Sequence, residues 1–587
     1  MERFAATSAQ ALSRALTELS GSEFKVTASD LETPPDPKLG DLGFPCFRLA
    51  KQFRKGPPQL ASELSSKVAP HLAALTSDIE VKPVGPYVNF VVKPSAIAAA
   101  LLHDILSGPG LGSYGSMPAR TRGKWVLEYS SPNVAKPFNI YHLRPTALGA
   151  ALDRIGRYRG FDLVTINHLG DWGTQYGKLA IAFREYGKDL PASPTIEDLV
   201  QIYVKFHAAV ESNPGLEDEA RKAFLKLEQG DPEMTALWKK CVDISLKEFH
   251  RLYARIGVAF DHIWGESHYE KQLAPMLEDL KKRGVLEQSE GAWVAQVTDR
   301  AGKEIPPCIL QKSDGATIYA TRDVAAACYR WEQFHFDRMT YIVGGEQKLH
   351  FEQVFGTLRK MGKDWEPRCE HVPTGLYRFK DAKMSTRKGN FVTLEEVLEL
   401  AKDRVREILM GRENLSLSGE ALETMAEQVA IGAVIFHDLH SDPARDVEFD
   451  VDRVVDFEGE TGPYLQYAHT RCLSILRKAR ESGELAGEVE FSAALSAALS
   501  QEEEFALLKQ LGQFGLHLER SLTHGKASQL AHYLIDVTQA FGSFYRECKV
   551  LGEGAQTTGA RLMLVEATRR ILGQGMKLLG VPAPERM

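Results

Sequence analysis

Residues 130–142 of the chain read Ser130-Ser-Pro-Asn-Val-Ala-Lys-Pro-Phe-Asn-Ile-Tyr-His142. They follow a short apolar run, Trp125-Val126-Leu127, and precede a stretch from Leu143 to Tyr158 with apolar residues at helical spacing. A strand, a polar turn and a helix in this order present backbone N–H groups and a helix N-terminus to a phosphate group. Lys136 and His142 lie where that phosphate would bind. Taken alone, the pattern also fits an ordinary surface turn.

A second basic segment lies far downstream, Lys383-Met-Ser-Thr-Arg-Lys-Gly-Asn390, after a predicted strand at Leu376–Phe379. A lysine, a serine and a further lysine beside a glycine can form a loop that closes on a triphosphate. Such a loop stabilises the charge that develops as pyrophosphate leaves. The commoner fate of a basic run is a solvated turn, so the two segments indicate a nucleotide site only together.

Strands and helices alternate from Lys124 onward, which predicts a parallel sheet with crossover helices. Sheet-like segments are expected at 162–167, 313–323 and 339–343. The polar, glycine-rich segment His168–Gly177 follows the first of these, and ligands of such sheets bind beyond the carboxyl ends of the strands. Residues from about 190 to 290 are polar with helical spacing, and we interpret them as a helical insertion into this sheet domain.

The segments outside the sheet predict two further domains. Near the N-terminus, helical patterns at 4–19 and 58–75 accompany a strand at 85–92, and beyond residue 395 only amphipathic helical patterns appear. The fold class we predict is a multidomain α/β and all-α protein. Its parts are an N-terminal α+β domain (1–106), a linker (107–123), a Rossmann-type catalytic domain (124–394, with the insertion at about 190–290) and a C-terminal helical bundle (395–587).

Composition excludes several classes of protein. The 587 residues are 44% hydrophobic and 25% charged, as in soluble globular proteins, and the net charge of −7 leaves room only for local basic patches. The seven cysteines form no C-x-x-C pair, so neither a disulfide framework nor a zinc ribbon is expected. No run of about eighteen apolar residues suggests a membrane span, and we expect a cytoplasmic protein without a membrane partner.

Five motifs, in order and at suitable spacing, resemble the arginyl-tRNA synthetases, a family of class I aminoacyl-tRNA synthetases. The resemblance covers nearly the whole chain. The motifs are Ser131-Pro-Asn-Val-Ala-Lys136 with His142-Leu-Arg144, Asn167-His-Leu-Gly-Asp-Trp-Gly-Thr-Gln-Tyr-Gly177, Lys383-Met-Ser-Thr-Arg-Lys-Gly389, Thr461-Gly-Pro-Tyr-Leu-Gln-Tyr-Ala-His469 and Leu578-Leu-Gly-Val-Pro-Ala-Pro-Glu-Arg-Met587.

The resemblance implies an arginine–tRNA ligase. Arginine would attack the α-phosphate of ATP to give arginyl-adenylate and pyrophosphate, and the arginyl group would then pass to the terminal ribose of tRNA(Arg). A guanidinium group has five donors and no acceptor, so its pocket needs a carboxylate and neutral acceptors. By resemblance, the arginine-binding residues are Ser131, Asn133, Asn167, Tyr319, Asp323 and Gln347. Without the resemblance, Asp323 would be interpreted as a helix cap.

The resemblance also assigns the nucleotide and tRNA contacts. Its catalytic group comprises His142, Lys136, Lys383, Ser385 and Lys388, and its ATP-binding group comprises Asn139, Tyr141, His142 and Met384. The expected tRNA contacts are Tyr87, Asn89, Tyr464, Gln466 and Met587, of which the first two are on composition an ordinary sheet exterior. Mg²⁺ is expected only as the partner of ATP, with no protein-bound metal, and the family implies a monomer whose arginine activation requires tRNA.

The chain departs from the family at three positions. The first signature, normally His-x-Gly-His, reads Asn139-Ile-Tyr-His142, and Tyr141 places a phenol where a glycine would let adenine approach the backbone. Thr386 stands where related enzymes have a second lysine, and Lys136 is the expected substitute. Two alternatives therefore stay open: a non-catalytic tRNA-binding paralogue, favoured by Tyr141, and a nucleotidyl transferase that acts without tRNA, disfavoured by the helical C-terminal region.

Overall fold

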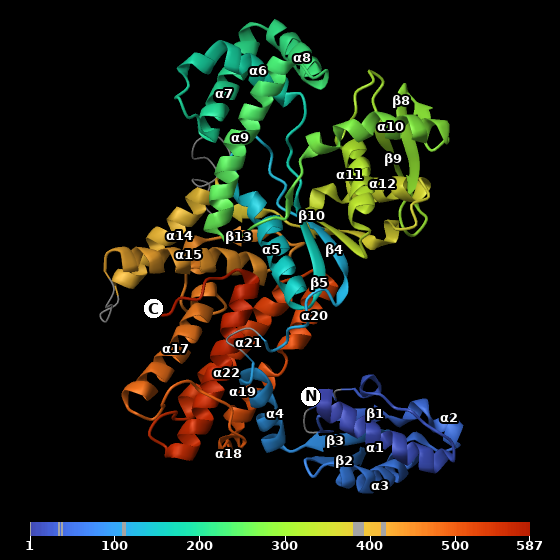
Figure 1. The fold of residues 1–587 in the computed structure, drawn as a ribbon, viewed down its shortest axis with the longest axis vertical. Coiled ribbons are helices and arrows are strands. Elements are labelled where there is room, and N and C mark those ends of the chain that lie inside the picture. The colour runs from blue at the N-terminus through green and yellow to red at the C-terminus, as the bar shows by residue number, and fades with distance from the viewer. Residues whose placement is uncertain are drawn as a thin grey trace. The chain divides into compact units, whose positions relative to one another are not determined.

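The computed structural model describes residues 2–32, 34, 36, 39–108, 113–379, 392–411 and 418–587. These residues form two compact units, each assembled from separate stretches of chain (Figure 1). The first unit comprises residues 1–114, 472–513 and 536–571, and the second comprises 115–471, 514–535 and 572–587. Three of the five boundaries between the units fall inside helices, namely α17 (Gly462–Glu481), α21 (Ser528–Glu547) and α22 (Ala555–Leu579).

The first unit begins with an α+β arrangement, as predicted. Its three-stranded antiparallel sheet has the order β1-β3-β2, and α1 and α3 pack against each other along buried apolar faces. The elements are α1 (Glu2–Ser20), β1 (Leu42–Pro45), α2 (Ala50–Phe53), α3 (Pro57–Leu75), β2 (Ile79–Val84), β3 (Tyr87–Val92), α4 (Pro94–Leu106), α18 (Ala493–Ser496) and α19 (Glu502–Leu511). Arg570 joins α22 to α4, since its guanidinium donates to the carbonyls of Ile105 and Leu106.

The second unit is built on a five-stranded parallel sheet with the order β11-β10-β4-β5-β6. The central strand β4 has a fully buried apolar segment, which is typical of a strand covered on both faces. The strands are β4 (Arg122–Glu128), β5 (Phe161–Asn167), β6 (His262–Ile263), β10 (Arg338–Gly344) and β11 (Cys369–Thr374). The prediction of a Rossmann-type parallel sheet is confirmed.

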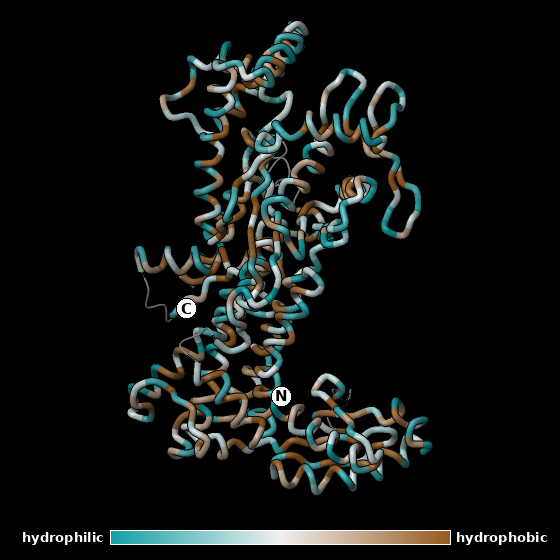
Figure 2. The backbone as a smooth tube through the Cα atoms, turned by 45° about the vertical axis from the view of Figure 1, so that its right-hand side comes forward, coloured by the Kyte–Doolittle hydropathy of each residue, from teal (hydrophilic) through white to brown (hydrophobic). Residues whose placement is uncertain are grey.

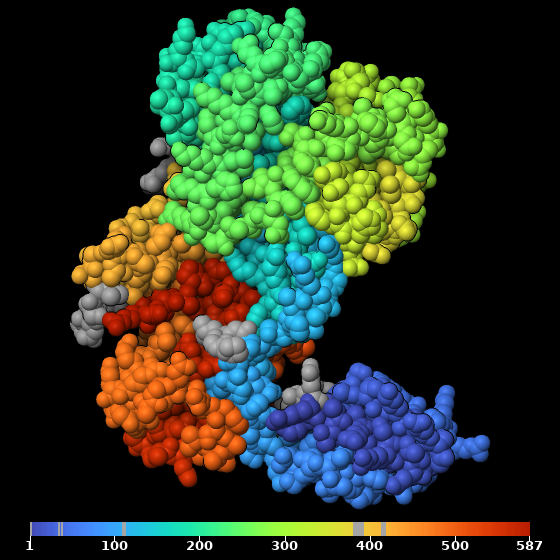
Figure 3. Space-filling view, viewed as in Figure 1, coloured from blue at the N-terminus to red at the C-terminus, as the bar shows by residue number. Residues whose placement is uncertain are grey.

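Helices connect and flank these strands. The helix α5 begins and ends where the apolar spacing predicted, at Leu143 and Tyr158. The other helices of this part are α6 (Gln175–Tyr186), α7 (Ile196–Ser212), α8 (Gly215–Glu228), α9 (Pro232–Arg255), α10 (Glu270–Lys282), α11 (Tyr319–Phe334) and α12 (Lys348–Lys360). Figure 3 shows the surface of α6–α9 as one closely packed group of side chains.

Two features of this region differ from the sequence prediction. Residues 287–311 form an antiparallel sheet, β7 (Glu287–Ser289), β8 (Ala292–Thr298) and β9 (Glu304–Gln311), which begins at the end of the predicted helical insertion and was not predicted. The segment 313–323 was expected to be sheet-like, and that prediction is wrong: it forms a turn, a single bridge between Gln311 and Thr317, and the first turn of α11. Its β-branched and aromatic residues occupy a helix N-terminus because Ile318 and Thr321 cap that helix.

The C-terminal half is helical, as predicted. Its elements in the second unit include α14 (Leu394–Met410), α15 (Glu420–His440), α16 (Val451–Val454) and α20 (Phe514–His524), with one parallel strand pair, β12 (Tyr377–Phe379) and β13 (Val447–Phe449). In Figure 2 hydrophobic and hydrophilic stretches alternate along these helices, as expected of amphipathic helices. The helical pattern that runs through residues 502–518 forms two helices, α19 and α20, which are separated by Gly512 and Gln513.

Candidate active site

The sheet order places a crevice beside β4. Along the chain, β4 is the first strand of the sheet, and the later strands are added on its two sides, β5 on one and β10 on the other. In open α/β sheets ligands bind at this switch point, outside the carboxyl ends of the strands. A cavity of about 400 Å³ lies here. Its lining includes Glu128, Ser130, Ser131, Asn133, Asn139, Tyr141, His142, His168, Gly170, Glu266, Tyr319, Asp323, Glu346, Gln347 and His350.

The segment after β4, which we call the β4 turn (residues 130–135), forms one wall of the cavity. Ser130, Ser131 and Ala135 have φ angles of 78°, 50° and 60°. The left-handed region is strained for residues with a Cβ, and such strain concentrates at functional sites. Gly170 packs against this turn so closely that a Cβ at its position would lie 2.2 Å from Asn133 Oδ1. The turn therefore has a single, tightly determined path.

His142 ends a short 3-10 turn that Asn139 caps. The Asn139 side chain accepts a hydrogen bond from Tyr141 N at 3.1 Å, and the backbone N–H of Asn139 donates to His142 Nδ1 at 3.3 Å. Burial lowers the pKa of His142 to about 4, and the nearby charge of Lys136 lowers it further. His142 is therefore neutral near pH 7, and because Nδ1 accepts, its proton sits on Nε2 as a donor.

The other end of the cavity is acidic. Its wall carries the carboxylates of Glu128, Glu266, Asp323 and Glu346, and within the described ranges no lysine or arginine lines it. Asp323, on the first turns of α11, is held at 2.5 Å by His350 Nε2 and at 3.7 Å by His168 Nε2. Burial opposes ionisation of Asp323, but the hydrogen bond and charge of His350 keep its pKa below the usual value.

Glu266 lacks a comparably strong partner. Burial raises the pKa of Glu266 to about 7, and the negative charges of Asp323, Asp171 and Glu270 raise it further. Arg322 opposes this shift, but its Nε lies 3.9 Å from the Glu266 carboxylate. A buried carboxylate with this pKa gains most from a new positive charge. The acidic end is therefore suited to a cationic group.

Arg330 compensates the buried Glu128. Its guanidinium, 1% exposed, forms an ion pair with the Glu128 carboxylate and donates to Tyr269 OH at 3.2 Å. The same guanidinium lies 3.2 Å from His168 Nδ1, and since arginine only donates, His168 Nδ1 accepts and His168 Nε2 carries the proton toward Asp323. The charge of Glu128 is thus already balanced by a close ion pair, whereas the contact of Glu266 with Arg322 is longer, at 3.9 Å.

The structure brings most of the sequence-predicted site residues to this cavity: Ser131, Asn133, Asn139, Tyr141, His142, Tyr319, Asp323 and Gln347. Asn167 lies behind the β4 turn and is fully buried. Its side-chain oxygen accepts a hydrogen bond from the backbone N–H of Ser131, and its Nδ2 donates to Tyr253 OH. Lys136 is exposed and does not line the cavity. Lys383, Met384, Ser385 and Lys388 lie outside the described residues.

Sequence reasoning missed five titratable residues of the cavity: Glu128, His168, Glu266, Glu346 and His350. His168 stands inside a quoted motif, and Glu128 is the last residue of β4, so their positions gave a usable signal. Glu266 and His350 belong to none of the five motifs, and only the fold brings them near Asp323.

The sequence-predicted tRNA contacts lie in different surroundings. In the first unit Tyr87 is half-buried and its ring packs edge-on against Phe47, while Asn89 is buried and donates to Leu39 O at 3.0 Å. In the second unit Gln466 is buried and donates to Pro582 O at 2.8 Å, which fastens the C-terminal tail to α17. Tyr464 and Met587 keep part of their surface exposed.

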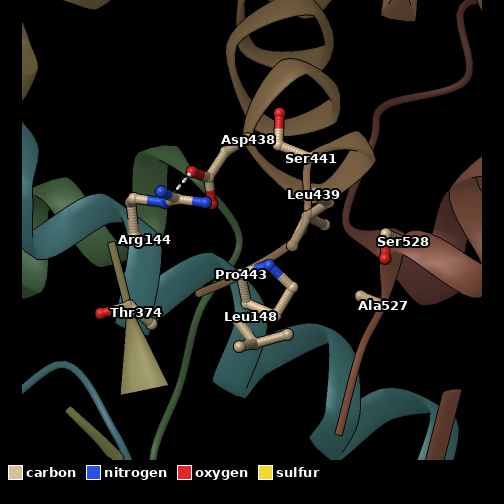
Figure 4. A pocket seen from close by; sticks show the side chains of 9 residues that line it. All are labelled: Arg144, Leu148, Thr374, Asp438, Leu439, Ser441, Pro443, Ala527 and Ser528. Carbon is tan, nitrogen blue, oxygen red and sulfur yellow. Dashed lines mark ion pairs between the residues drawn. The ribbon is translucent and has the colours of Figure 1, made fainter. Parts of the chain in front are cut away.

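A small cavity of about 10 Å³ lies where α5 meets α15, and a space of this size holds one water molecule at most. Arg144 and Asp438 point toward one another across it (Figure 4), and Arg144 Nε lies 2.8 Å from Asp438 Oδ1. Tyr377 OH donates to the same carboxylate at 2.9 Å, which joins β12 to α15. This cluster anchors the helix that begins with the signature histidine, and it is too small to be a ligand site.

Three family models match the chain. The model described as "tRNA synthetases class I (R), catalytic domain" matches residues 107–451. "DALR anticodon binding domain" matches 465–587 and "Arginyl tRNA synthetase N terminal domain" matches 6–92. No group of three or more potential metal ligands is found among the residues that the structure describes, and none of the helices searched there could span a membrane.

Characterised relatives are similar over the full length. The arginine–tRNA ligase of Clostridium perfringens is 42% identical over 560 residues, which cover 95% of this chain and 96% of the relative. That of Clostridioides difficile is 38% identical over 588 residues and covers all of both chains. The arginyl-tRNA synthetase structure of Thermus thermophilus has a TM-score of 0.77 at 25% identity and 99% coverage of each chain. The Plasmodium falciparum structure, at 23% identity, TM-score 0.77 and full coverage of both chains, has the same fold.

Proposed function

The chain belongs to the arginyl-tRNA synthetases, class I enzymes that charge tRNA(Arg), and on that premise we propose how its cavity carries out the reaction. The reaction joins arginine to ATP as arginyl-adenylate, releases pyrophosphate and passes the arginyl group to the terminal ribose of tRNA(Arg). No covalent enzyme intermediate is required. Positioning of the two substrates and stabilisation of charge therefore supply the rate.

One observation carries the assignment of the arginine end: four carboxylates and no described lysine or arginine line that wall. The guanidinium group binds between Asp323 and Glu266, because Asp323 is already ionised and Glu266 gains a partner that lowers its pKa. Tyr319 and Gln347 supply neutral hydrogen-bonding groups at the same wall.

The α-amino and α-carboxylate groups of arginine lie toward the β4 turn. Ser131 Oγ is buried and has no hydrogen-bond partner among the residues that the structure describes, and the neighbouring Asn133 side chain is exposed to the cavity. Unpaired buried hydroxyls are costly, so a substrate group that bonds Ser131 is favoured. We assign Asn167 an indirect role, because its amide is fully engaged behind the turn.

ATP occupies the end of the cavity near Asn139, Tyr141 and His142. The neutral His142 donates from Nε2 to a phosphate oxygen, and Tyr141, 38% exposed, presents its ring to the nucleotide. The ATP site is completed by the residues that match the second signature: Lys383, Met384, Ser385 and Lys388. Lys136 supplies additional positive charge near His142. Mg²⁺ enters with ATP.

The regions outside the sheet bind tRNA(Arg). The N-terminal domain (1–106) contacts tRNA through Tyr87, and Asn89 supports the strand that carries it. The C-terminal domain (395–587) contacts tRNA through Tyr464 and Met587, and Gln466 holds the C-terminal tail in place. The linker (107–123) and the sheet domain (124–394) lie between them in the sequence. We propose a monomer that works in the cytoplasm, where tRNA, ATP and arginine are available.

Charging of bulk tRNA with each labelled amino acid, in the presence of ATP and Mg²⁺, tests this proposal. The expected result is that arginine alone becomes attached to tRNA. Arginine-dependent pyrophosphate exchange, which measures the first step of the reaction, should require tRNA. Binding of tRNA without any charging would identify a non-catalytic paralogue, and adenylation of an acid without tRNA would identify a nucleotidyl transferase. Charging with an amino acid other than arginine would overturn the assignment of the acidic wall.

A further inference from the structure

The β4 turn is strained at three residues, and each of them makes at least one hydrogen bond to a side chain outside the turn. Ser130 Oγ lies 2.7 Å from Tyr253 OH. The backbone N–H of Ser131 donates to Asn167 Oδ1 at 3.2 Å, and the backbone N–H of Ala135 donates to Ser245 Oγ at 2.9 Å. Since the left-handed conformation is unfavourable for a residue with a Cβ, such bonds help to keep the turn in this conformation.

Two of these three partners, Ser245 and Tyr253, belong to the helix α9, and the third depends on it. The Asn167 side chain donates through Nδ2 to Tyr253 OH at 3.0 Å, so the tyrosine also orients the amide that holds Ser131. On the far side, Thr146 Oγ1 lies 2.7 Å from Ser130 Oγ and donates to the carbonyl of His142 at 2.6 Å. A buried chain of hydrogen bonds thus joins Asn167, Tyr253, Ser130 and Thr146 to the signature histidine.

The sequence of α9 suits this role. Cys241, Ser245, Phe249 and Tyr253 recur every four residues and form its buried stripe. Within that apolar stripe the hydroxyls of Ser245 and Tyr253 both find partners, as buried polar groups must. Phe138 packs between Phe249 and Tyr253, with ring centroids 5.9 Å and 5.6 Å apart, and so joins the stripe to the segment that leads into His142.

The C-terminal end of α9 is itself anchored. Arg255 pairs with Glu427 on α15 and with Glu399 on α14, both at 2.7 Å. The helix is therefore held on one side while it holds the β4 turn on the other. We propose that α9 acts as a clamp, in which Ser245 and Tyr253 are positioning residues that keep Ser131 and Asn133 aimed at arginine. The expected effect on arginine kinetics rests on the proposed function, whereas the expected effect on the conformation of the β4 turn does not.

Four variants test the clamp. Ser245→Ala removes the acceptor of the Ala135 amide, and Tyr253→Phe removes only the hydroxyl that joins Ser130 and Asn167. Ser521→Ala is the matched control: Ser521 is equally buried in α20 and makes the same bond to the carbonyl four residues earlier, with no partner in the turn. Ala135→Gly is the rescue variant, because glycine adopts a φ of 60° without strain.

With arginine, ATP and tRNA as substrates, Ser245→Ala and Tyr253→Phe are expected to lower kcat/KM for arginine about tenfold. Ser521→Ala should stay within twofold of the wild type. The double variant Ser245→Ala with Ala135→Gly should recover to within about threefold, since the turn then needs no clamp. A purely structural loss of α9 stability would not be repaired by a glycine in another segment. Unchanged kinetics in Ser245→Ala, or a loss that glycine does not repair, would overturn the clamp.

Hydrogen exchange of the peptide that covers residues 130–142 gives a readout independent of activity. Faster exchange in Ser245→Ala, with no change in Ser521→Ala, supports the clamp. This holds even if the wild type charges no tRNA, because the lack of charging would refute only the proposed function. Equal exchange in both variants and the wild type would refute the clamp itself.

Discussion

The two ends of the cavity are organised by different forces. At the acidic end, charged partners hold the carboxylates: Asp323 by His350 and Glu128 by Arg330. At the nucleotide end, neutral hydrogen bonds and strained backbone hold the side chains, from the Asn139 cap to the β4 turn. The acidic end therefore responds to pH near neutrality through Glu266, whereas His142, with a pKa of about 4, does not. One end is prepared for a cation, and the other for a polyanion.

Asp323→Asn should produce the largest effect. The substitution keeps the shape but removes the charge that faces the guanidinium and leaves His350 without its ionised partner. Breaking a close charge pair costs about 2–5 kcal/mol, so kcat/KM for arginine should fall about 10³-fold. Steady-state pyrophosphate exchange measures this, and KM for ATP should change less than threefold. An equal rise in both KM values would show that the two ends are not separate.

His142→Ala breaks the nucleotide end. Loss of a donor that faces developing phosphate charge lowers kcat about 10²-fold. Because the wild-type imidazole stays neutral above its pKa of about 4, no ionisation of His142 should appear in the pH profile of kcat between pH 5.5 and 8. A wild-type profile with a step near pH 6.5 that His142→Ala abolishes would contradict this assignment.

Glu266→Gln sharpens the comparison, because it removes the group that titrates near neutrality. In the wild type KM for arginine should fall as pH rises from 6 to 8, since ionised Glu266 binds the guanidinium. At pH 8 the variant should have a KM about 10- to 30-fold higher, without this pH dependence. Arginine titrations at several pH values measure both effects. A pH-dependent KM that persists in Glu266→Gln would assign the titration to another group.

The same variant also tests stability. Because the pKa of Glu266 is about 7 in the folded protein and its ordinary value is 4.5, the folded form holds the proton more tightly. Its contribution to the free energy of unfolding is therefore largest below pH 4.5 and is lost as pH rises through 7. Thermal unfolding at pH 8 should show Glu266→Gln to be more stable than the wild type, at the expense of arginine affinity.

The nucleotide end was more predictable from sequence than the acidic end, and the reason is physical. Strand β4, its turn and α5 follow one another in the chain. Their apolar periodicity and the polar residues between them therefore predict this part of the site from one stretch of sequence. Glu266 and His350 reach Asp323 only through the packing of the 3-10 turn Glu266–Tyr269, α11 and α12, which no local pattern encodes. Likewise Asn167 was predicted to face arginine, but β5 places it behind the turn, where it supports Ser131 instead.

The segments that the sequence patterns did not reveal correctly have separate physical causes. Residues 313–323 have strand-like composition, yet Thr321 caps α11 and its hydroxyl donates to Leu310 O, a tertiary contact that overrides propensity. In the antiparallel sheet at 287–311, β9 exposes Pro306, Pro307 and Ile309, so apolar residues lie on both of its faces and conceal its alternation. Gly512 ends α19, although the apolar spacing continues across it into α20.

Tyr141→Gly should have the smallest effect, and it tests the departure of this chain from the usual first signature. The ring is 38% exposed at the cavity wall, and the backbone N–H of Tyr141 is already satisfied by Asn139. Removing the ring deletes one aromatic contact with the nucleotide, worth about 1 kcal/mol, so KM for ATP should rise about three- to fivefold. Tyr141→Phe, which keeps the ring, is the control and should match the wild type. A lower KM for ATP in Tyr141→Gly would mean that the ring obstructs the site, so that the nucleotide end, unlike the acidic end, is not yet arranged for its substrate in the free protein.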